Sequence, residues 1–292
     1  MINMLTTEKL NVFFLGKAFS GSTILGSFLN KHPKICYIGE LDRLPGNTDY
    51  NPLHYGPEVC IRCALKQSSC RLFSKTTVSK ISNGNPIQAI EFIRRKVNKP
   101  IIVDGSKNVD WLRIALSNQN PEVVNSSKVI ILVKNPASFL YSCNDRGTGQ
   151  LWEEANAWRD LYVDAIRTTN QLGVAALLVR VEDFESNKEL VLKRVCSFLN
   201  VPFTNNMFSP DNDMHSIGGN GRAALTSLDK KSQKKILSEI ELRDFGINPK
   251  KVKKNKIIQV KKSIDINLLE TVFMTPGLLD IASQLGYKFS DF

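Results

Sequence analysis

The sequence contains no apolar run that approaches the roughly 20 residues needed to cross a bilayer. Its first ten residues, Met1–Leu10, also lack the basic segment and apolar stretch that mark a secretory leader. We therefore expect a soluble, cytoplasmic protein whose cysteines are mostly reduced. The chain has 292 residues, of which 42% are hydrophobic, and this apolar content is enough for a full core and excludes wholesale disorder.

Histidine is scarce, with three residues, and the six cysteines include a single C-x-x-C pair. Three cysteines form the pattern Cys60-x2-Cys63-x6-Cys70, which is half of a typical zinc site; Cys36 or His54 would be possible further ligands. No second C-x-x-C pair completes a set of four. We therefore interpret these residues as reduced structural thiols in a loop insertion and assign no metal to the functional site.

Acidic residues are fewer than basic ones, 28 against 39, and the formal net charge is +11. This balance suits an anionic ligand. Part of the excess is a lysine-rich segment near the C-terminus, made of Lys250, Lys251, Lys253, Lys254, Lys256, Lys261 and Lys262. We interpret it as a solvated face, with nucleic-acid or membrane contact as the alternative. We expect neither a nucleic acid nor a membrane as a partner, and the sequence does not indicate an oligomeric state.

Apolar runs of strand length alternate with helical patterns, which is typical of a parallel sheet with crossover helices. The expected strands are residues 11–16, 34–38, 100–104, 128–134 and 175–181. The expected helices are residues 21–31, 86–97, 109–118, 136–145, 151–172 and 188–199. The pattern predicts an α/β fold with three αβα layers around a parallel sheet of about five strands.

We expect one domain over residues 1–292. Residues 42–80 show little periodicity and are interpreted as an irregular insertion or lid over the site. Residues 227–292 are interpreted as a basic helical C-terminal extension. In the helix expected over 151–172, Trp152, Trp158 and Tyr162 fall on one face, and we assign them to the core.

The most informative segment is Gly16–Thr23, which reads Gly-Lys-Ala-Phe-Ser-Gly-Ser-Thr. It has the G-x-x-x-x-G-x-[ST] spacing of a P-loop and lies between an expected strand and an expected helix. Backbone N–H groups and the helix dipole at such a position bind an anion. Ser22 stands where ATP-binding loops have the lysine that reaches the β- and γ-phosphates. The loop therefore favours a phosphate ligand that has no γ-phosphate.

Further polar groups follow the other expected strands, and in a doubly wound sheet such positions converge on one crevice. They are Glu40 in Gly39-Glu40-Leu41, Lys107 in Asp104-Gly105-Ser106-Lys107, and Lys134 in Lys134-Asn135-Pro136. Ser142 lies eight residues after Lys134, about two helical turns on, and Arg146 follows one turn later on the same face. A later loop carries Asn220, Gly221 and Arg222.

In these motifs the sequence resembles sulfotransferases that use 3′-phosphoadenosine 5′-phosphosulfate (PAPS). Five segments carry the resemblance: Phe19-Ser20-Gly21-Ser22-Thr23-Ile24-Leu25, His32-Pro33 with Gly39-Glu40-Leu41, Asp104-Gly105-Ser106-Lys107, Lys134-Asn135-Pro136 with Ser142, and Val181-Glu182-Asp183-Phe184. Gly219-Asn220-Gly221-Arg222 is similar to a late element of that family. The cysteine pattern is similar to a bacterial branch with cysteines in this insertion. The likeness spans about residues 11 to 223.

The resemblance implies a P-loop-like sulfotransferase fold, PAPS as the donor and the bisphosphate PAP as its product. The implied residues for the 5′-phosphosulfate are Lys17, Ala18, Phe19, Ser20, Gly21, Ser22 and Thr23. The implied residues for the 3′-phosphate are Lys134, Ser142 and Arg146, and the Asn220-Gly221-Arg222 loop completes the donor site. The acceptor would be a hydroxyl or amine of a small molecule or secondary metabolite.

For catalysis, Glu40 matches the general base of the related tyrosylprotein sulfotransferases, and Lys107 would stabilise charge on the sulfuryl group during in-line displacement. Phe19 stands where many relatives have a cation beside the leaving phosphate; either Lys17 replaces that cation or Lys107 acts alone. His54 and His215 are alternative bases. The competing functions are a P-loop kinase or NTPase, which Ser22 argues against, and a non-catalytic nucleotide-binding protein.

Overall fold

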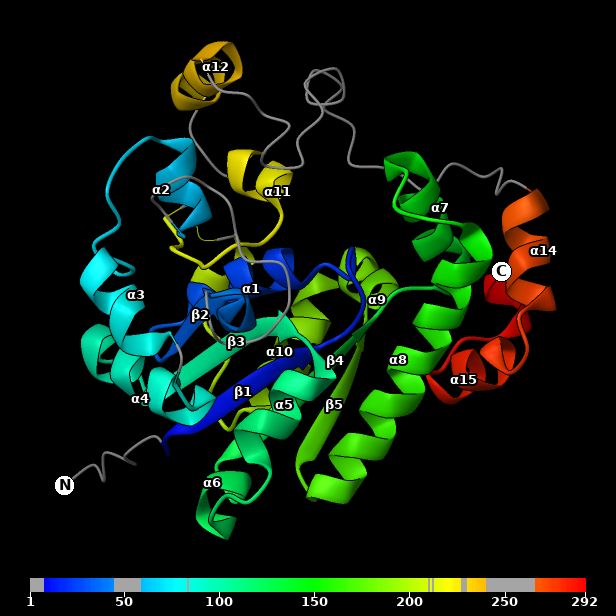
Figure 1. The fold of residues 1–292 in the computed structure, drawn as a ribbon, viewed down its shortest axis with the longest axis horizontal. Helices are drawn as coiled ribbons and strands as arrows, with labels where there is room; N and C mark the ends of the chain where they lie inside the picture. The colour runs from blue at the N-terminus through cyan, green and yellow to red at the C-terminus, as the bar shows by residue number, and fades with distance from the viewer. Residues whose placement is uncertain are drawn as a thin grey trace.

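The computed structural model describes residues 8–44, 59–82, 84–209, 211, 213–226, 230–239 and 266–292. At its centre lies a five-stranded parallel sheet with the strand order β2-β3-β1-β4-β5 (Figure 1). The strands are β1 (Leu10–Leu15), β2 (Ile35–Gly39), β3 (Ile101–Lys107), β4 (Ser127–Val133) and β5 (Ala175–Arg180). Each lies where the sequence predicted a strand, and the prediction of an α/β fold with a parallel sheet is confirmed.

The six helices expected from the sequence are present, with ends within a few residues of the prediction. They are α1 (Ser22–Asn30), α4 (Pro86–Val97), α5 (Val109–Leu116), α7 (Pro136–Arg146), α8 (Leu151–Leu172) and α10 (Lys188–Phe198). Four of them begin after an asparagine whose side chain accepts a backbone N–H of the first turn: Asn85, Asn108, Asn135 and Asn187. The sequence did not predict the short helices α6 (Pro121–Asn125) and α9 (Val181–Ser186).

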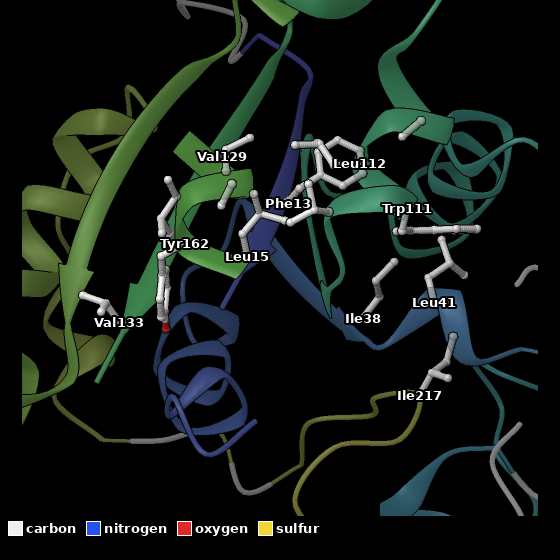
Figure 2. Close-up of a cluster of buried hydrophobic side chains, with 14 of the residues drawn as sticks. Phe13, Leu15, Ile38, Leu41, Trp111, Leu112, Val129, Val133, Tyr162 and Ile217 are labelled. Carbon is white, nitrogen blue, oxygen red and sulfur yellow. The ribbon is translucent and has the colours of Figure 1, made fainter. Parts of the chain in front are cut away.

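The sheet packs against helices on both faces, and successive side chains of its strands point alternately into the two cores. Phe13 and Leu15 of β1 belong to one core, which includes residues of α4, α5 and α8, and part of which is shown in Figure 2. Val12 and Phe14 belong to the other core, with residues of α1 and α10. These two cores account for the continuous apolar runs of the central strands.

The prediction that residues 42–80 are irregular is wrong where the described part forms short helices. α2 (Ile61–Leu65) and α3 (Lys75–Ile81) lie in the segment, and η1 (Leu41–Arg43) overlaps its start. Helices of one or two turns are too short to show a clear 3.6-residue period, which explains why the sequence did not indicate them. Residues 45–58, and with them His54, lie outside the described residues.

One side chain of α8 is not where the sequence placed it. Trp158 and Tyr162 are fully buried, as expected, but Trp152 is 64% exposed. Trp152 lies in the first turn of the helix, where it lines a surface hollow with residues of α14 (Ile266–Met274). The apolar stripe of α8 therefore leaves the core at its N-terminal end.

The C-terminal segment contributes α14 and α15 (Leu278–Gln284), which contact α7 and α8 (Figure 1). Helices α11 (Gly221–Thr226) and α12 (Lys230–Glu239) precede them in the chain, and η2 (Asn205–Phe208) and η4 (Phe289–Asp291) are 3-10 turns. The lysine-rich stretch 250–262 lies outside the described residues. Within the described ranges, no helix is both long and apolar enough to span a membrane.

Candidate active site

The candidate site lies beyond the carboxyl ends of the strands, around the point where the chain changes direction across the sheet. From β1 the chain proceeds to β2 and β3 on one side, whereas β4 and β5 lie on the other. Such a switch point leaves a crevice between the loops that follow the two adjacent strands, here β1 and β4. The loop after β1 is the P-loop-like segment, and the loop after β4 begins with Lys134.

The loop after β1 depends on two glycines. Gly16 has a φ of 150°, and a Cβ atom there would lie 2.4 Å from the carbonyl oxygen of Leu132. Gly21, in the left-handed conformation, is the residue before the first turn of α1. Phe19 between them also has a positive φ, 68°, which is costly for a non-glycine residue and is typical of functional loops.

Two buried hydroxyls at this loop point to an anion as the ligand. Ser20 Oγ is buried and has no hydrogen-bond partner among the described residues. The Tyr37 hydroxyl lies beside Ser22 and Thr23 but makes no hydrogen bond of good geometry in the described part of the chain. Burial, together with the charges of Glu40 and Asp104, raises the pKa of Tyr37, so its hydroxyl remains a neutral donor. Buried donors of this kind normally have an acceptor.

Glu40 and Lys107 meet in the site, as the sequence predicted for residues at adjacent strand ends. The Lys107 Nζ donates to Glu40 Oε1 at 2.6 Å, and the Arg43 guanidinium donates to Glu40 Oε2 at 3.0 Å. Burial raises the pKa of Glu40, but the two cations outweigh it and the net pKa lies below its ordinary value. Glu40 is therefore a carboxylate at neutral pH. Lys107 has a φ of 64°, so a second non-glycine residue of the site is held in the left-handed region.

A buried network holds the strand ends that carry this ion pair. Asp104 is fully buried and accepts hydrogen bonds from Ser106 and from the Trp111 indole at 2.8 Å. The Ser106 hydroxyl in turn accepts the backbone N–H of Asp42 at 3.1 Å, so the start of η1 is tied to the end of β3. Burial raises the pKa of Asp42 to about 7, and the charges of Asp104 and Glu40 add to the effect.

Because the pKa of Asp42 is raised, we expect the stabilities of the wild type and of Asp42→Asn to depend differently on pH. The folded protein favours protonated Asp42, so this stabilisation is complete below the ordinary aspartate pKa of 3.8 and is lost as the pH rises through about 7. Between about pH 5 and pH 8 the free energy of unfolding of the wild type should fall by roughly 2–3 kcal/mol relative to that of the variant. Urea unfolding of both proteins at several pH values measures the difference. Parallel stability curves would contradict the assignment.

Lys134 and Ser142 also meet. The Lys134 Nζ donates to Ser142 Oγ at 2.8 Å, so two residues that the sequence assigned to one anion site lie together. Burial lowers the pKa of Lys134, whereas Glu182 and Glu185 act in the opposite direction. Asn135 next to it caps α7 by accepting the N–H groups of Ala137 and Ser138. The pair therefore consists of a partly buried cation just before α7 and a hydroxyl in the middle of that helix.

Lys17 and Arg146 flank a pair of aromatic rings at the P-loop. The rings of Phe19 and Phe139 have centroids 6.5 Å apart. The Arg146 guanidinium lies 4.2 Å from the Phe19 ring centroid, and the Lys17 Nζ lies 5.6 Å from that of Phe139. Lys17 also forms an ion pair with Glu154 at 3.6 Å. Both cations are thus held next to the loop from the α7 and α8 side.

The loop predicted over residues 211–222, which carries Asn220 and Gly221, lies at the β2 side of the site. Ile217 bridges Gly39 of β2, and Figure 2 shows it near Ile38 and Leu41. The Asn220 backbone N–H donates to Thr23 Oγ1 at 3.1 Å, so this loop contacts the first turn of α1. Gly221 begins α11, and the Arg222 side chain is outside what the structure describes.

Sequence reasoning assigned no role in the site to four residues: Asp42, Arg43, Glu182 and Tyr287. Arg43 and Asp42 lie in a segment that we interpreted only as an insertion, although the i,i+3 spacing of Glu40 and Arg43 was a possible signal. Glu182 accepts the Asn135 backbone N–H at 2.9 Å and the Tyr287 hydroxyl at 2.8 Å. Nothing in the sequence indicates that Tyr287, near the C-terminus, contacts Glu182 in the segment after β5.

The expected alternative base His215 does not face the Glu40–Lys107 pair. Its Nδ1 atom lies 3.4–3.5 Å from the sulfur atoms of Cys60, Cys63 and Cys70. The ring is therefore occupied by the cysteines of the insertion. The other alternative, His54, lies outside the described residues.

Comparison of the sequence with models of known protein families gives no match. Comparison with curated proteins also gives none. Solved structures, however, resemble this one over nearly its whole length. The sulfotransferase domain of the Synechococcus PCC 7002 olefin synthase has a TM-score of 0.59 at 18% identity and covers 97% of both chains. The sulfotransferase domain from the curacin biosynthetic pathway has a TM-score of 0.60 at 19% identity and covers 96% of this chain and 98% of that one. The chain therefore has the fold of sulfotransferase domains.

Proposed function

We propose that this protein is a sulfotransferase that uses PAPS as its donor. The observation that carries the proposal is a second group of anion-binding side chains, Lys134 and Ser142, in contact at 2.8 Å. This pair follows β4, whereas the P-loop-like segment follows the adjacent strand β1 and lacks the ATP-binding lysine. A donor with phosphate groups at both its 5′ and 3′ positions needs two anion sites. A nucleoside triphosphate needs one extended site with a lysine at the position of Ser22.

The residues present fit the 5′ group. The unpartnered Ser20 hydroxyl, the Tyr37 hydroxyl and the first N–H groups of α1 would donate to the 5′-phosphosulfate. Lys134 and Ser142 would hold the 3′-phosphate, with Arg146 one turn further along α7. The Asn220 loop would close the site from the other side, since its backbone already contacts Thr23.

PAPS supplies a sulfuryl group on a good leaving group, so the protein has to orient the acceptor and move one proton. Glu40 is a buried carboxylate and is suited to accept the proton of an acceptor hydroxyl or amine. Lys107 now donates to Glu40 and is suited to donate instead to the anionic sulfuryl group. If the Lys107 ammonium moved from Glu40 to the sulfuryl group, the pKa of Glu40 would rise, because one of the two cations that lower it would have left.

The absence of a cation at position 19 has a physical compensation in this proposal. The Arg146 guanidinium stacks on the Phe19 ring, and Lys17 lies against Phe139. Two positive charges therefore remain next to the loop although residue 19 is aromatic. Lys17 would serve the leaving 5′-phosphate, and Arg146 would serve the 3′-phosphate.

We infer an acceptor with a hydroxyl or amine on a small molecule, such as a secondary metabolite. The support is that both solved neighbours are domains of biosynthetic systems, an olefin synthase and the curacin pathway. The segments that would form the acceptor pocket are the 42–80 insertion, the 144–152 loop and the 209–222 loop. A cytoplasmic location without a nucleic-acid partner is part of the same proposal.

Calorimetric titration with PAP, and separately with ATP, tests the proposed function. PAP should bind tightly in buffer without Mg²⁺, and ATP should bind weakly with or without Mg²⁺. ATP binding that requires Mg²⁺ would favour a kinase or NTPase instead. PAP binding without sulfate release from PAPS or transfer to any acceptor would favour a non-catalytic nucleotide-binding protein.

A further inference from the structure

A second cluster of reactive side chains lies outside the candidate active site. Cys60, Cys63, Cys70 and His215 each offer one ligand atom, and these four atoms lie within 4.8 Å of one another. The three cysteines are buried. They come from the start of α2 and the segment after it, whereas His215 comes from the loop before α11, some 145 to 155 positions further along the chain. The sequence suggested Cys36 or His54 as the further ligand, but among the described residues the fold brings the His215 imidazole to the three thiols.

The distances fit a tetrahedral metal site. His215 Nδ1 lies 3.5 Å from Cys60 Sγ and 3.4 Å from both Cys63 Sγ and Cys70 Sγ. With metal bonds of about 2.3 Å to sulfur and about 2.0–2.1 Å to nitrogen, a tetrahedron has nitrogen–sulfur edges of about 3.5 Å. One ring nitrogen can accept a hydrogen bond from one thiol, so hydrogen bonding alone does not explain three equal contacts.

We propose that Cys60, Cys63, Cys70 and His215 bind a structural Zn²⁺ ion. Three thiolates and one imidazole in tetrahedral arrangement are a ligand set that selects zinc, and four protein ligands leave no open position for catalysis. The backbone N–H of Phe73 donates to Cys70 Sγ at 3.3 Å, a contact that stabilises a metal-bound thiolate. The ligands are drawn from two separate segments, so the ion would join the insertion to the 213–220 loop.

The position of the site gives the ion a role in the donor site. Next to the ligands, Ile61 N donates to Ser216 O and Gly218 N donates to Val59 O. Two residues beyond, the Asn220 backbone contacts Thr23 of α1. Fixing His215 to the insertion therefore fixes the loop that closes the phosphate site. The metal content is independent of the proposed function, whereas an effect on PAP binding rests on it.

Metal analysis of the purified full-length protein tests the proposal. Cells are grown with zinc and the protein is purified without chelators. We expect about one zinc per chain, and Cys60→Ser or Cys70→Ser should lose it. Cys196→Ser is the matched control, because Cys196 is buried but contacts Met207 instead of the cluster. His215→Cys, which keeps four ligands, should retain zinc, and this separates ligation from a general effect on folding.

Removal of the ion from the wild type gives a readout that needs no variant. After treatment with a chelator, thiol titration should detect three more reactive cysteines than before, and re-added Zn²⁺ should protect them again. The thermal midpoint should fall and PAP should bind severalfold more weakly, both reversibly. A wild-type protein without zinc, or with zinc that survives Cys60→Ser and Cys70→Ser, would overturn the site. Unchanged PAP affinity after zinc removal would overturn its role in the donor site.

Discussion

Replacing Glu40 by glutamine should lower turnover by about 10²–10⁴-fold, the usual contribution of a positioned general base. Glutamine keeps the shape of the side chain but cannot take the acceptor's proton. It also removes the partner of Lys107, so some loss of stability is expected, about 1–3 kcal/mol. Sulfate release from PAPS, with water as the acceptor, measures turnover before the natural acceptor is known.

The control for this variant is Glu91→Gln. Glu91 pairs with the buried Arg94, whose guanidinium contacts the Leu10 and Pro100 carbonyls at the opposite ends of the strands. It should lose stability without losing turnover. A Glu40→Gln protein that folds, binds PAP as the wild type does and turns over at the full rate would refute Glu40 as the base. Equal losses in PAP binding and turnover would assign Glu40 a structural role instead.

Replacing Lys134 by methionine should weaken PAP binding by about 10–100-fold. This corresponds to the loss of a charge-assisted hydrogen bond worth roughly 1.5–3 kcal/mol. Adenosine 5′-monophosphate lacks the 3′-phosphate, so its affinity should change little. The difference between the two ligands, measured by calorimetry on both proteins, isolates the interaction with the 3′ group.

Lys128→Met is the matched control, because Lys128 lies near the start of β4, the strand that Lys134 follows, and its ammonium contacts the Phe198 carbonyl there. That variant should bind both nucleotides normally. If Lys134→Met weakens the binding of both nucleotides equally, Lys134 does not serve the 3′-phosphate. The contact with Ser142 would then only tie the end of β4 to the middle of α7.

The sequence predicted the sheet well because each strand contains an apolar run, and strands covered on both faces need such runs. It also grouped Lys134 with Ser142 through the motif that resembles sulfotransferases, and the two side chains are in contact. The same local reasoning could not place contacts between distant segments. Its failures are therefore the ones that depend on tertiary structure, such as Trp152 at the surface and Tyr287 at Glu182.

For the ion pair between Glu40 and Lys107, the sequence predicted that the two residues converge but not the third residue that joins them. Strand order could not be read from the sequence, but any doubly wound order brings loop residues to one edge, so convergence was predictable. The third member, Arg43, depends on the 3-10 turn at Leu41–Arg43, which is too short to leave a periodic signal. The imidazole opposite the cysteines depends on the path of the chain after α10, about which local patterns contain no information.

The bridge from Ile217 to Gly39 has a consequence for synthesis of the chain. β2 is an edge strand, and the residues that cover its end are made about 180 positions later. At typical rates of 5–20 residues per second, the ribosome needs roughly 10–40 s to reach them. During that interval the nascent chain exposes a strand edge, which is a template for pairing with other chains. Slower translation should therefore lower the soluble yield of this protein unless a chaperone covers β2.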